Sequence, residues 1–379
     1  MRTRRRIFLP AALTMALAAR AYFAAPGTLE WKTTLRFRDW SQGAIEGDMI
    51  AVGNSTDPGG LYALSASTGK LLWSANIGKT VRTAIGGGMV FASSETKFPD
   101  YSLVAFGSKT GREAWRVPLG YRTTQRVGYS EGRVLAPKSE EAKLLAFDAA
   151  SGKPAWTFSY GPGRGHCETG FATAPGAIYW GAGQDKGSIE TRQKPAGNFL
   201  FAIDARTGNL LWKREMRLQT YDDVGECVKT PVFDGKDTLF SVAWYRLFAV
   251  DAASGAVKWQ RDVLNADGKE TETGSPAYTA GMVIVTGGGL MQGFRASGGQ
   301  PVWKAPLANG GQWDQMAAAD GVVYLGGLTA VQELAAVDAA TGKLLWKAST
   351  PGSSVARDIV FSPGAVYGWT FFNYFRMAR

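Results

Sequence analysis

The fold is decided by one stretch, Ala146-Phe147-Asp148-Ala149-Ala150-Ser151-Gly152-Lys153-Pro154-Ala155-Trp156, because near-copies of it recur along most of the chain. The clearest copies occupy residues 63–73, 105–115, 202–212, 249–259 and 336–346, and a degraded copy occupies 293–303. The tryptophans that end the seven copies are separated by 42, 41, 56, 47, 44 and 43 residues. This period is typical of propeller blades of four strands each.

Each copy predicts a β-hairpin. Two short apolar runs, such as residues 61–64 and 71–73, flank a Ser-Thr-Gly-Lys turn in which glycine adopts a positive φ at little cost. A second hairpin signal precedes most copies, as in residues 281–287 and 321–327. One repeat therefore supplies four strands, which make one blade.

The tryptophan at the end of each copy predicts a contact between blades. An indole in the outer strand can lie over the small Ala and Gly of a neighbouring blade, burying roughly 150 to 250 Å². Eight tryptophans fill this structural role, and none of them is a candidate for chemistry: Trp31, Trp73, Trp115, Trp156, Trp212, Trp259, Trp303 and Trp346.

Trp31 matches only the second half of the repeat, and the missing first half lies at the other end of the chain. Residues 358–361, 364–369 and 372–375 read as three strands of a last blade, after which the chain stops one strand short. We therefore expect the segment around Trp31 to supply the fourth strand and leave no free sheet edge. The sequence predicts an all-β, eight-bladed propeller of four-stranded antiparallel blades.

The repeated Ala-x-Asp-x-x-Thr-Gly-x-x-x-Trp pattern resembles the docking signature of the quinoprotein-alcohol-dehydrogenase-like propellers. The resemblance covers almost all of the chain after its first 25 residues. It implies the fold, whereas the function stays open, since this propeller serves both as an enzyme and as a non-catalytic scaffold.

Residues 1–25 predict an export signal, and residues 26–379 a single propeller domain. A basic head with Arg5 and Arg6 precedes an apolar stretch too short to span a bilayer, so we expect no transmembrane segment in the mature chain. Residues 5–9 fit the twin-arginine export pattern, and an ordinary secretory signal is the alternative. We expect a periplasmic or extracellular protein.

The charge of the chain gives no case for nucleic-acid binding. The formal charge is +10, and five arginines of the expected signal account for half of it, which leaves about +5. The remaining 37 cations and 32 anions are interspersed without a block of one sign.

The two cysteines, Cys167 and Cys227, occupy equivalent positions in adjacent repeats. In an exported protein such a pair is expected to be oxidised, and we predict a disulfide between the fourth and fifth blades worth about 4 kcal/mol. A thiol-redox role is the alternative. A metal site is disfavoured because His166 is the only histidine of the chain.

The longest repeat predicts an insertion between residues 181 and 198, which are polar and rich in turn residues. Long loops on rigid scaffolds often carry binding sites, and a tolerated surface insertion is the alternative.

Polar residues at the starts of the first strands, most of them charged, predict a channel mouth of mixed sign. The ligand-binding candidates among them are Arg82, Arg126, Lys229, Glu272, Gln315 and Arg357. The cations could bind a small anionic molecule, and a salt-bridged, water-filled lining is the alternative. The recurring Asp148, Asp204, Asp251 and Asp338 are expected to cap turns rather than to catalyse. We therefore name no catalytic residue.

The resemblance leaves two functional hypotheses. In the dehydrogenases, a disulfide between adjacent cysteines stacks on pyrroloquinoline quinone (PQQ); this chain has no Cys-Cys pair and no haem-binding motif. The favoured hypothesis is an exported scaffold that binds envelope proteins or a small ligand without a cofactor. It is similar to the propeller subunit of the outer-membrane β-barrel assembly (Bam) machinery. A PQQ- and Ca²⁺-dependent dehydrogenase is the alternative.

Overall fold

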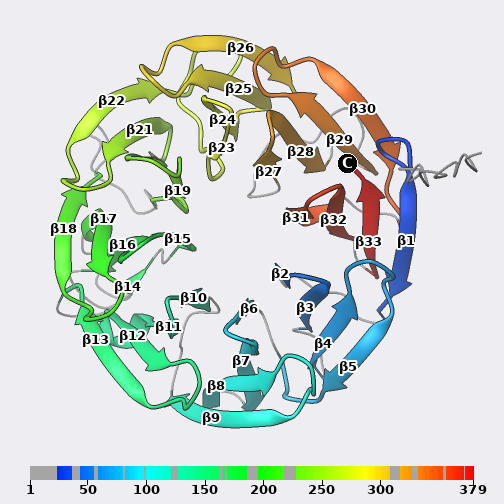
Figure 1. Ribbon diagram of the computed structural model, residues 1–379. Helices are drawn as coiled ribbons and strands as arrows, with labels where there is room; N and C mark the ends of the chain where they lie inside the picture. Colours follow the sequence, from blue (N-terminus) through cyan, green and yellow to red (C-terminus); the bar gives the residue numbers. More distant parts are fainter. Residues whose placement is uncertain are drawn as a thin grey trace, which may run out of the picture.

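A computed structural model describes most of the chain after residue 23 (Figure 1). The described residues are 24–35, 43–54, 59–79, 82–97, 100–120, 127–161, 165–166, 169–185, 195–216, 228–307, 316–326, 332–352, 356–370 and 372–379. They form eight sheets that follow one another around a ring, as expected for an eight-bladed propeller. Residues 1–23, which include most of the expected export signal, lie outside the described part, as do Cys167 and Cys227.

Each blade is an antiparallel sheet. In blades 1 to 7 the strands run in chain order from the inside of the ring to the outside, and in blade 8 the outermost strand comes from the N-terminal end of the chain. Blade 1 contains β2 (Ala44–Glu46), β3 (Met49–Asn54), β4 (Gly60–Ser65) and β5 (Leu71–Ala75), and blade 2 contains β6 (Thr83–Gly86), β7 (Met89–Lys97), β8 (Asp100–Gly107) and β9 (Glu113–Gly120). Blade 3 contains β10 (Gly128–Ser130), β11 (Arg133–Lys138), β12 (Lys143–Asp148) and β13 (Pro154–Ser159). Blade 4 contains β14 (Gly165–His166), β15 (Phe171–Ala174), β16 (Ala177–Asp185), β17 (Pro195–Asp204) and β18 (Leu210–Glu215). Blade 5 contains β19 (Val232–Phe233), β20 (Thr238–Ala243), β21 (Arg246–Asp251) and β22 (Val257–Asp262), and blade 6 contains β23 (Ala277–Thr279), β24 (Met282–Gly287), β25 (Leu290–Arg295) and β26 (Pro301–Pro306). Blade 7 contains β27 (Met316–Ala319), β28 (Val322–Gly326), β29 (Glu333–Asp338) and β30 (Leu344–Ser349). Blade 8 contains β31 (Arg357–Ser362), β32 (Ala365–Thr370), β33 (Asn373–Ala378) and β1 (Leu29–Thr34).

The expected hairpin turns form as the repeat predicts. In blade 3, Asp148 accepts hydrogen bonds from the backbone N–H and the hydroxyl of Ser151 at 3.0 and 2.7 Å, and Gly152 follows with a φ of +69°. Asp204, Asp251 and Asp338 bind the equivalent Thr or Ser in the same way. The recurring aspartates are therefore turn caps, as predicted.

The repeat tryptophans join each blade to the next. Trp212 of blade 4, for example, lies over Gly255 of blade 5, where an added Cβ would come within 2.7 Å of the indole. Its Nε1 donates to the carbonyl oxygen of Ala252 at 2.9 Å. Seven of the eight tryptophans make such a bond to the next blade, and all eight lie against a glycine of the next blade.

The first alanine of the repeat has a different neighbour from the one expected. It lies opposite the tryptophan of its own blade, as Ala63 does with Trp73 and Ala249 with Trp259, rather than under an indole from the neighbouring blade. Small size is needed there too. In the degraded repeat of blade 6 the position is Gly293, whose added Cβ would lie 2.3 Å from the ring of Trp303.

The ring closes with the N-terminal strand, as the half-repeat at Trp31 predicts. Strand β1 pairs antiparallel with β33, the last strand of the chain. Trp31 packs on Gly69 of blade 1 and donates to the carbonyl oxygen of Ala66 at 3.0 Å. Opposite Trp31 stands Arg376, which forms an ion pair with Glu30 at 3.0 Å.

The insertion expected at residues 181–198 is only partly a loop. Residues 181–185 extend β16 and residues 195–198 begin β17, so the excess lengthens a hairpin. The short strand β14 pairs with the end of β16 at Gly183 and Gln184. Residues 186–194, the rest of the insertion, lie outside the described part.

Because the strands of every blade are antiparallel, successive turns alternate between the two faces of the ring. The two faces therefore carry different connections. The turn face carries the Asp-capped turns, together with the turns between first and second strands. The mouth face carries the turns between second and third strands, together with the connections from blade to blade. The hydrophobic core lies between neighbouring blades, as where Leu144 of blade 3 packs with Ile178 and Phe201 of blade 4. No helix in the described residues is long and apolar enough to cross a membrane.

Candidate functional site

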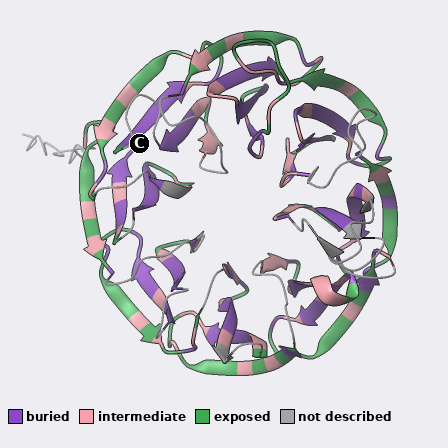
Figure 2. Cartoon of the chain, turned by 180° about the vertical axis from the view of Figure 1, so that it is seen from behind, coloured by how far each residue is buried: buried purple, intermediate pink, exposed green. Residues whose placement is uncertain are grey.

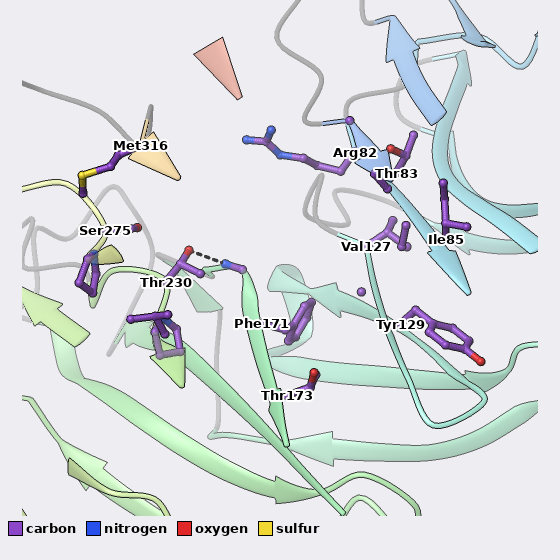
Figure 3. A pocket seen from close by; sticks show the side chains of 18 residues that line it. Arg82, Thr83, Ile85, Val127, Tyr129, Phe171, Thr173, Thr230, Ser275 and Met316 are labelled. Atoms are coloured by element: carbon purple, nitrogen blue, oxygen red, sulfur yellow. Dashed lines mark hydrogen bonds between the residues drawn. The ribbon is translucent and has the colours of Figure 1, made fainter. Parts of the chain in front are cut away.

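A cavity of about 510 Å³ lies among the innermost strands (Figure 3). Seven of the eight blades contribute to its lining, which is Gly43, Ala44, Arg82, Thr83, Ala84, Ile85, Val127, Gly128, Tyr129, Gly170, Phe171, Thr173, Thr230, Pro231, Val232, Ser275, Pro276 and Met316. Small residues and prolines predominate, since the first strands converge towards the ring axis and leave little room for side chains.

Arg82 is the one charged side chain that the described part of the chain contributes to the cavity lining. It precedes β6, and its half-buried side chain extends away from Ile85 and Tyr129 into the cavity (Figure 3). The hydroxyl of Thr83 is engaged elsewhere, because it donates to the carbonyl oxygen of Ala51 at 3.0 Å. Thr230 accepts a hydrogen bond from the Gly170 N–H at 3.0 Å, which joins blades 4 and 5.

The aromatic residues of the lining pack between inner strands. An added Cβ at Gly86 would lie 2.1 Å from Tyr129, and one at Gly128 would lie 2.5 Å from Phe171. Tyr129 also stacks on Phe91 with ring centroids 5.9 Å apart. These contacts give both rings a structural role that requires no ligand.

The described lining can bind polar groups, but it lacks the groups that hydrolytic or metal-assisted chemistry needs. No carboxylate and no histidine line the cavity in the described residues. Nor do these residues contain a group of three or more His, Cys, Asp or Glu side chains placed to hold a metal. A guanidinium with neighbouring hydroxyls suits recognition of a carboxylate or a phosphate.

Lys229 and Glu272 lie on the mouth face and form an ion pair of 2.9 Å between blades 5 and 6. Both precede the first strands of their blades, whereas the sequence analysis places them at the strand starts. The Lys229 N–H donates to the carbonyl oxygen of Val242 at 2.7 Å, and its carbonyl oxygen accepts from the Ser241 hydroxyl at 3.0 Å. The backbone of this segment is thus fixed, and its ammonium group is occupied by a carboxylate.

The described residues place three of the six candidate side chains, Arg82, Lys229 and Glu272. Arg82 lines the cavity, and Lys229 and Glu272 pair with each other outside its lining. Arg357 begins β31, but its side chain lies outside the described part, as do Arg126 and Gln315. The anion site predicted from these residues therefore remains a prediction, and only its Arg82 is placed at a cavity.

Trp244 is a feature of the mouth face that the sequence analysis missed. It stands in the two-residue turn between β20 and β21 with a φ of +53°, a conformation that a bulky side chain rarely adopts. Its carbonyl oxygen accepts from the N–H and the hydroxyl of Thr273 at 3.2 and 2.6 Å. Blade 6 places Gly288 in the equivalent turn, also with a positive φ.

The connection from β22 to β23 holds this turn in place. Within it, the Asn265 side chain accepts from the N–H groups of Asp267 and Lys269 at 2.9 and 2.8 Å. The Val263 N–H donates to the carbonyl oxygen of Tyr245 at 2.7 Å. Strained backbone clusters at binding sites and tryptophan is enriched at the energetic centres of protein interfaces, so half-buried Trp244 is a candidate contact residue. Trp244 does not belong to the regularly spaced repeat tryptophans, and this departure is visible in the sequence.

Comparison with known families identifies the kind of propeller. The family model described as "Outer membrane protein assembly factor BamB" matches residues 18–116, 99–166 and 287–367, which together make up more than half of the chain. The chain belongs to this family. A curated BamB from Burkholderia pseudomallei (strain K96243) is 26% identical over 199 residues, which cover 49% of this chain. That match spans 47% of the relative, about half its length.

Solved structures share the propeller fold with this BamB-family chain at low sequence identity. BamB from Moraxella catarrhalis is 16% identical with a TM-score of 0.68, and the match covers 93% of this chain and 97% of that one. Quinohemoprotein alcohol dehydrogenase ADHIIG from Pseudomonas putida HK5 matches equally well, with 16% identity and a TM-score of 0.68, over 93% and 76% of the two chains. Sqt1 from Saccharomyces cerevisiae has a TM-score of 0.69 at 7% identity, over 94% and 100%. These likenesses establish the fold alone.

Proposed function

We propose that this chain is an exported, non-catalytic scaffold of outer-membrane protein assembly, which binds envelope proteins through its mouth face. Membership of the BamB family is the observation that carries the proposal, since the family model names that process. The expected export signal at residues 1–25 agrees with it, as does the expected disulfide between Cys167 and Cys227.

The described part of the mouth face suits recognition of a protein. Trp244 supplies an aromatic contact in a fixed turn, and the pair of Lys229 and Glu272 beside it offers charges of both signs. Arg246, two residues after Trp244, pairs with Asp262 at 2.6 Å. Aromatic residues surrounded by polar ones are the usual centres of binding energy at protein interfaces. A rigid platform loses little conformational entropy when a partner binds.

The quinone-dependent alternative fits the described lining poorly. Ca²⁺ takes six to eight oxygen ligands that include carboxylates, and the described residues of the cavity lining include no Asp or Glu. Among the described lining residues, Arg82 is the one cation that could meet a ligand carrying several carboxylates. The sequence also lacks the adjacent cysteines expected of the dehydrogenases. A small anionic ligand at Arg82 remains a secondary proposal, which needs only one guanidinium and neighbouring hydroxyls.

Affinity purification from envelope extracts of the source organism tests the proposal. We expect the tagged protein to co-purify with outer-membrane assembly proteins, and Trp244→Gly to reduce that recovery. Phe361→Ala is the control, because Phe361 is an exposed aromatic residue near the end of β31 on the turn face. Recovery of no assembly protein above the untagged background would contradict the proposal.

A titration with PQQ and Ca²⁺ tests the alternative separately. We expect no saturable change in the absorption spectrum and no dye reduction with alcohols or sugars. Tight binding accompanied by dye reduction would replace the scaffold by an enzyme.

A further inference from the structure

The outer wall of the propeller exposes leucines that its own packing does not require. The outer strands lie at the circumference and are largely exposed (Figure 2). The most exposed apolar side chains there are Leu71 (53%), Leu72 (50%), Leu344 (44%), Leu345 (52%), Leu29 (42%) and Val302 (40%), with Leu210 (47%), Leu211 (52%) and Val257 (40%) elsewhere on the ring. The tryptophan that follows in each strand already makes the contact between blades.

Lysines continue the outward-facing side of the same strands. Successive side chains of a strand point to opposite faces, so the residues immediately before and after the inward-facing tryptophan both point outward. In β26 these residues are Val302 and Lys304, and in β30 they are Leu345 and Lys347. In β1 they are Glu30 and Lys32, and in β5 they are Leu72 and Ser74. The wall thus carries an apolar side chain beside a lysine in β26 and β30, to which β1 adds Lys32 and β5 adds Leu72.

These residues form one continuous arc, because β26, β30, β1 and β5 follow one another around the ring (Figure 1). The contacts of Trp303 with Gly342, Trp346 with Gly27 and Trp31 with Gly69 fix that order. We call the residues of these four strands the leucine–lysine arc: Val302, Lys304, Leu344, Leu345, Lys347, Leu29, Lys32, Leu71 and Leu72. The equivalent outward positions of blades 2 and 3 carry Ala114 with Arg116 and Ala155 with Thr157.

The acidic groups near the arc are engaged within the protein, which leaves its outward charge positive. Glu30 pairs with Arg376 at 3.0 Å. Glu333, whose side chain is only 7% exposed, lies 3.7 Å from the ammonium group of Lys347. Lys32 and Lys304 are exposed and have no carboxylate partner among the described residues.

The composition of the arc suits a lipid surface better than a protein surface. Lysine is depleted at protein interfaces and leucine is under-represented among their energetic centres. Leucines beside lysines are typical of segments that lie in the membrane interface, where the apolar groups enter the acyl boundary and the cations meet anionic headgroups. The arc is also convex, so a flat partner touches one blade first. Leucines of the adjoining blades reach a flat partner only if the wall sinks into that partner, and a lipid bilayer permits this.

We propose that the leucine–lysine arc is a contact surface for a membrane that contains anionic phospholipids. The propeller would stand with its wall on the lipid, at blades 6, 7, 8 and 1. Both of its faces would remain accessible. The inference is independent of what the mouth face binds.

Vesicle co-sedimentation of the purified full chain tests the inference. We expect binding to phosphatidylcholine vesicles that contain phosphatidylglycerol, little binding to phosphatidylcholine alone, and release at high salt. The double substitution L344S/L345S is expected to weaken binding roughly tenfold, because two leucines no longer enter the lipid. K32Q/K304Q is expected to weaken binding and to reduce its salt dependence.

Two matched variants separate the arc from general effects. L210S/L211S removes an equally exposed leucine pair from blade 4, outside the arc, and should bind as the unaltered chain does. K153Q/K236Q removes the same charge at exposed sites elsewhere and should also leave binding unchanged. Absence of vesicle binding, or equal loss in L210S/L211S, would overturn the inference. A dimer in sedimentation velocity that L344S/L345S alone dissociates, without vesicle binding, would assign the arc to self-association instead.

Discussion

Trp346 lies against Gly27, so the indole of the last complete repeat packs on the segment just before β1, the first strand of the chain. A Cβ added at Gly27 would come within 2.9 Å of the indole, and the φ of Gly27 is +79°. The Gly27 N–H donates to the carbonyl oxygen of Ala378 at 2.9 Å. The N-terminal segment therefore closes the ring in two ways, by pairing with β33 and by receiving the tryptophan of blade 7.

Removal of residues 24–35 should open the ring. The loss of β1 leaves the whole edge of β33 without its partner strand, and unpaired strand edges promote association. We expect a lower melting temperature and oligomers in size-exclusion chromatography with light scattering. A synthetic peptide of residues 26–35 should restore the monomer. An unchanged, monomeric truncated protein would show that β1 is dispensable.

Gly255→Ala should destabilise the protein by about 2 to 4 kcal/mol, since it combines a left-handed backbone with a clash against Trp212. Gly235→Ala in the same blade is the matched control. Its φ of +81° is equally unfavourable, but nothing lies within 4 Å of the added Cβ. We expect the control to cost about 1 kcal/mol. Equal losses in urea unfolding would mean that the indole contact contributes little.

Trp244→Gly should leave stability unchanged or raise it. A φ of +53° strains tryptophan by about 1 kcal/mol or more, whereas glycine adopts this φ without strain. The hydrogen bonds from Thr273 use the backbone carbonyl and survive the substitution. The measurement is the melting temperature of the variant beside that of the unaltered chain. A large loss of stability would make Trp244 a packing residue rather than one kept for a partner.

Stability should fall in acid because of the turn aspartates. Hydrogen bonds from the hydroxyls and backbone N–H groups of Ser151, Thr207 and Ser254 hold the pKa values of Asp148, Asp204 and Asp251 below their usual range. A pKa lowered by folding gives stability that is complete above the unfolded pKa of about 4 and disappears as the pH falls through the folded value.

Urea unfolding as a function of pH measures this effect. We expect the urea concentration at the unfolding midpoint to decrease as the pH is lowered below about 4. It should decrease less steeply when all three aspartates are replaced by asparagine. An identical pH profile in the triple variant would exclude these carboxylates as the cause.

The ring could be predicted from the sequence because its parts repeat. A tryptophan at a fixed place in each copy predicts a contact between blades, and a half-copy at Trp31 predicts which strand closes the last one. The alanine opposite each tryptophan was assigned to the wrong blade, because sequence spacing does not distinguish a neighbour within a sheet from one in the next sheet.

The site was harder to predict because the connections that build it do not repeat. The pairing of Lys229 with Glu272 depends on where two connections of different length place their side chains. The strained turn at Trp244 depends on hydrogen bonds that the N–H and the hydroxyl of Thr273 donate to its carbonyl oxygen, for which the sequence has no pattern. The extra residues near position 190 were recognised as an insertion, but the number of extra residues does not show that they extend β16 and β17.

Photo-crosslinking from the two faces of blade 5 tests the scaffold account most directly. A photoreactive amino acid at Lys269, in the connection on the mouth face, is compared with one at Lys236, in the turn between β19 and β20 on the turn face; both positions are exposed. In envelope extracts the account predicts adducts with outer-membrane assembly proteins from position 269 and none from position 236. Adducts from position 236 alone, or from neither position, would contradict it.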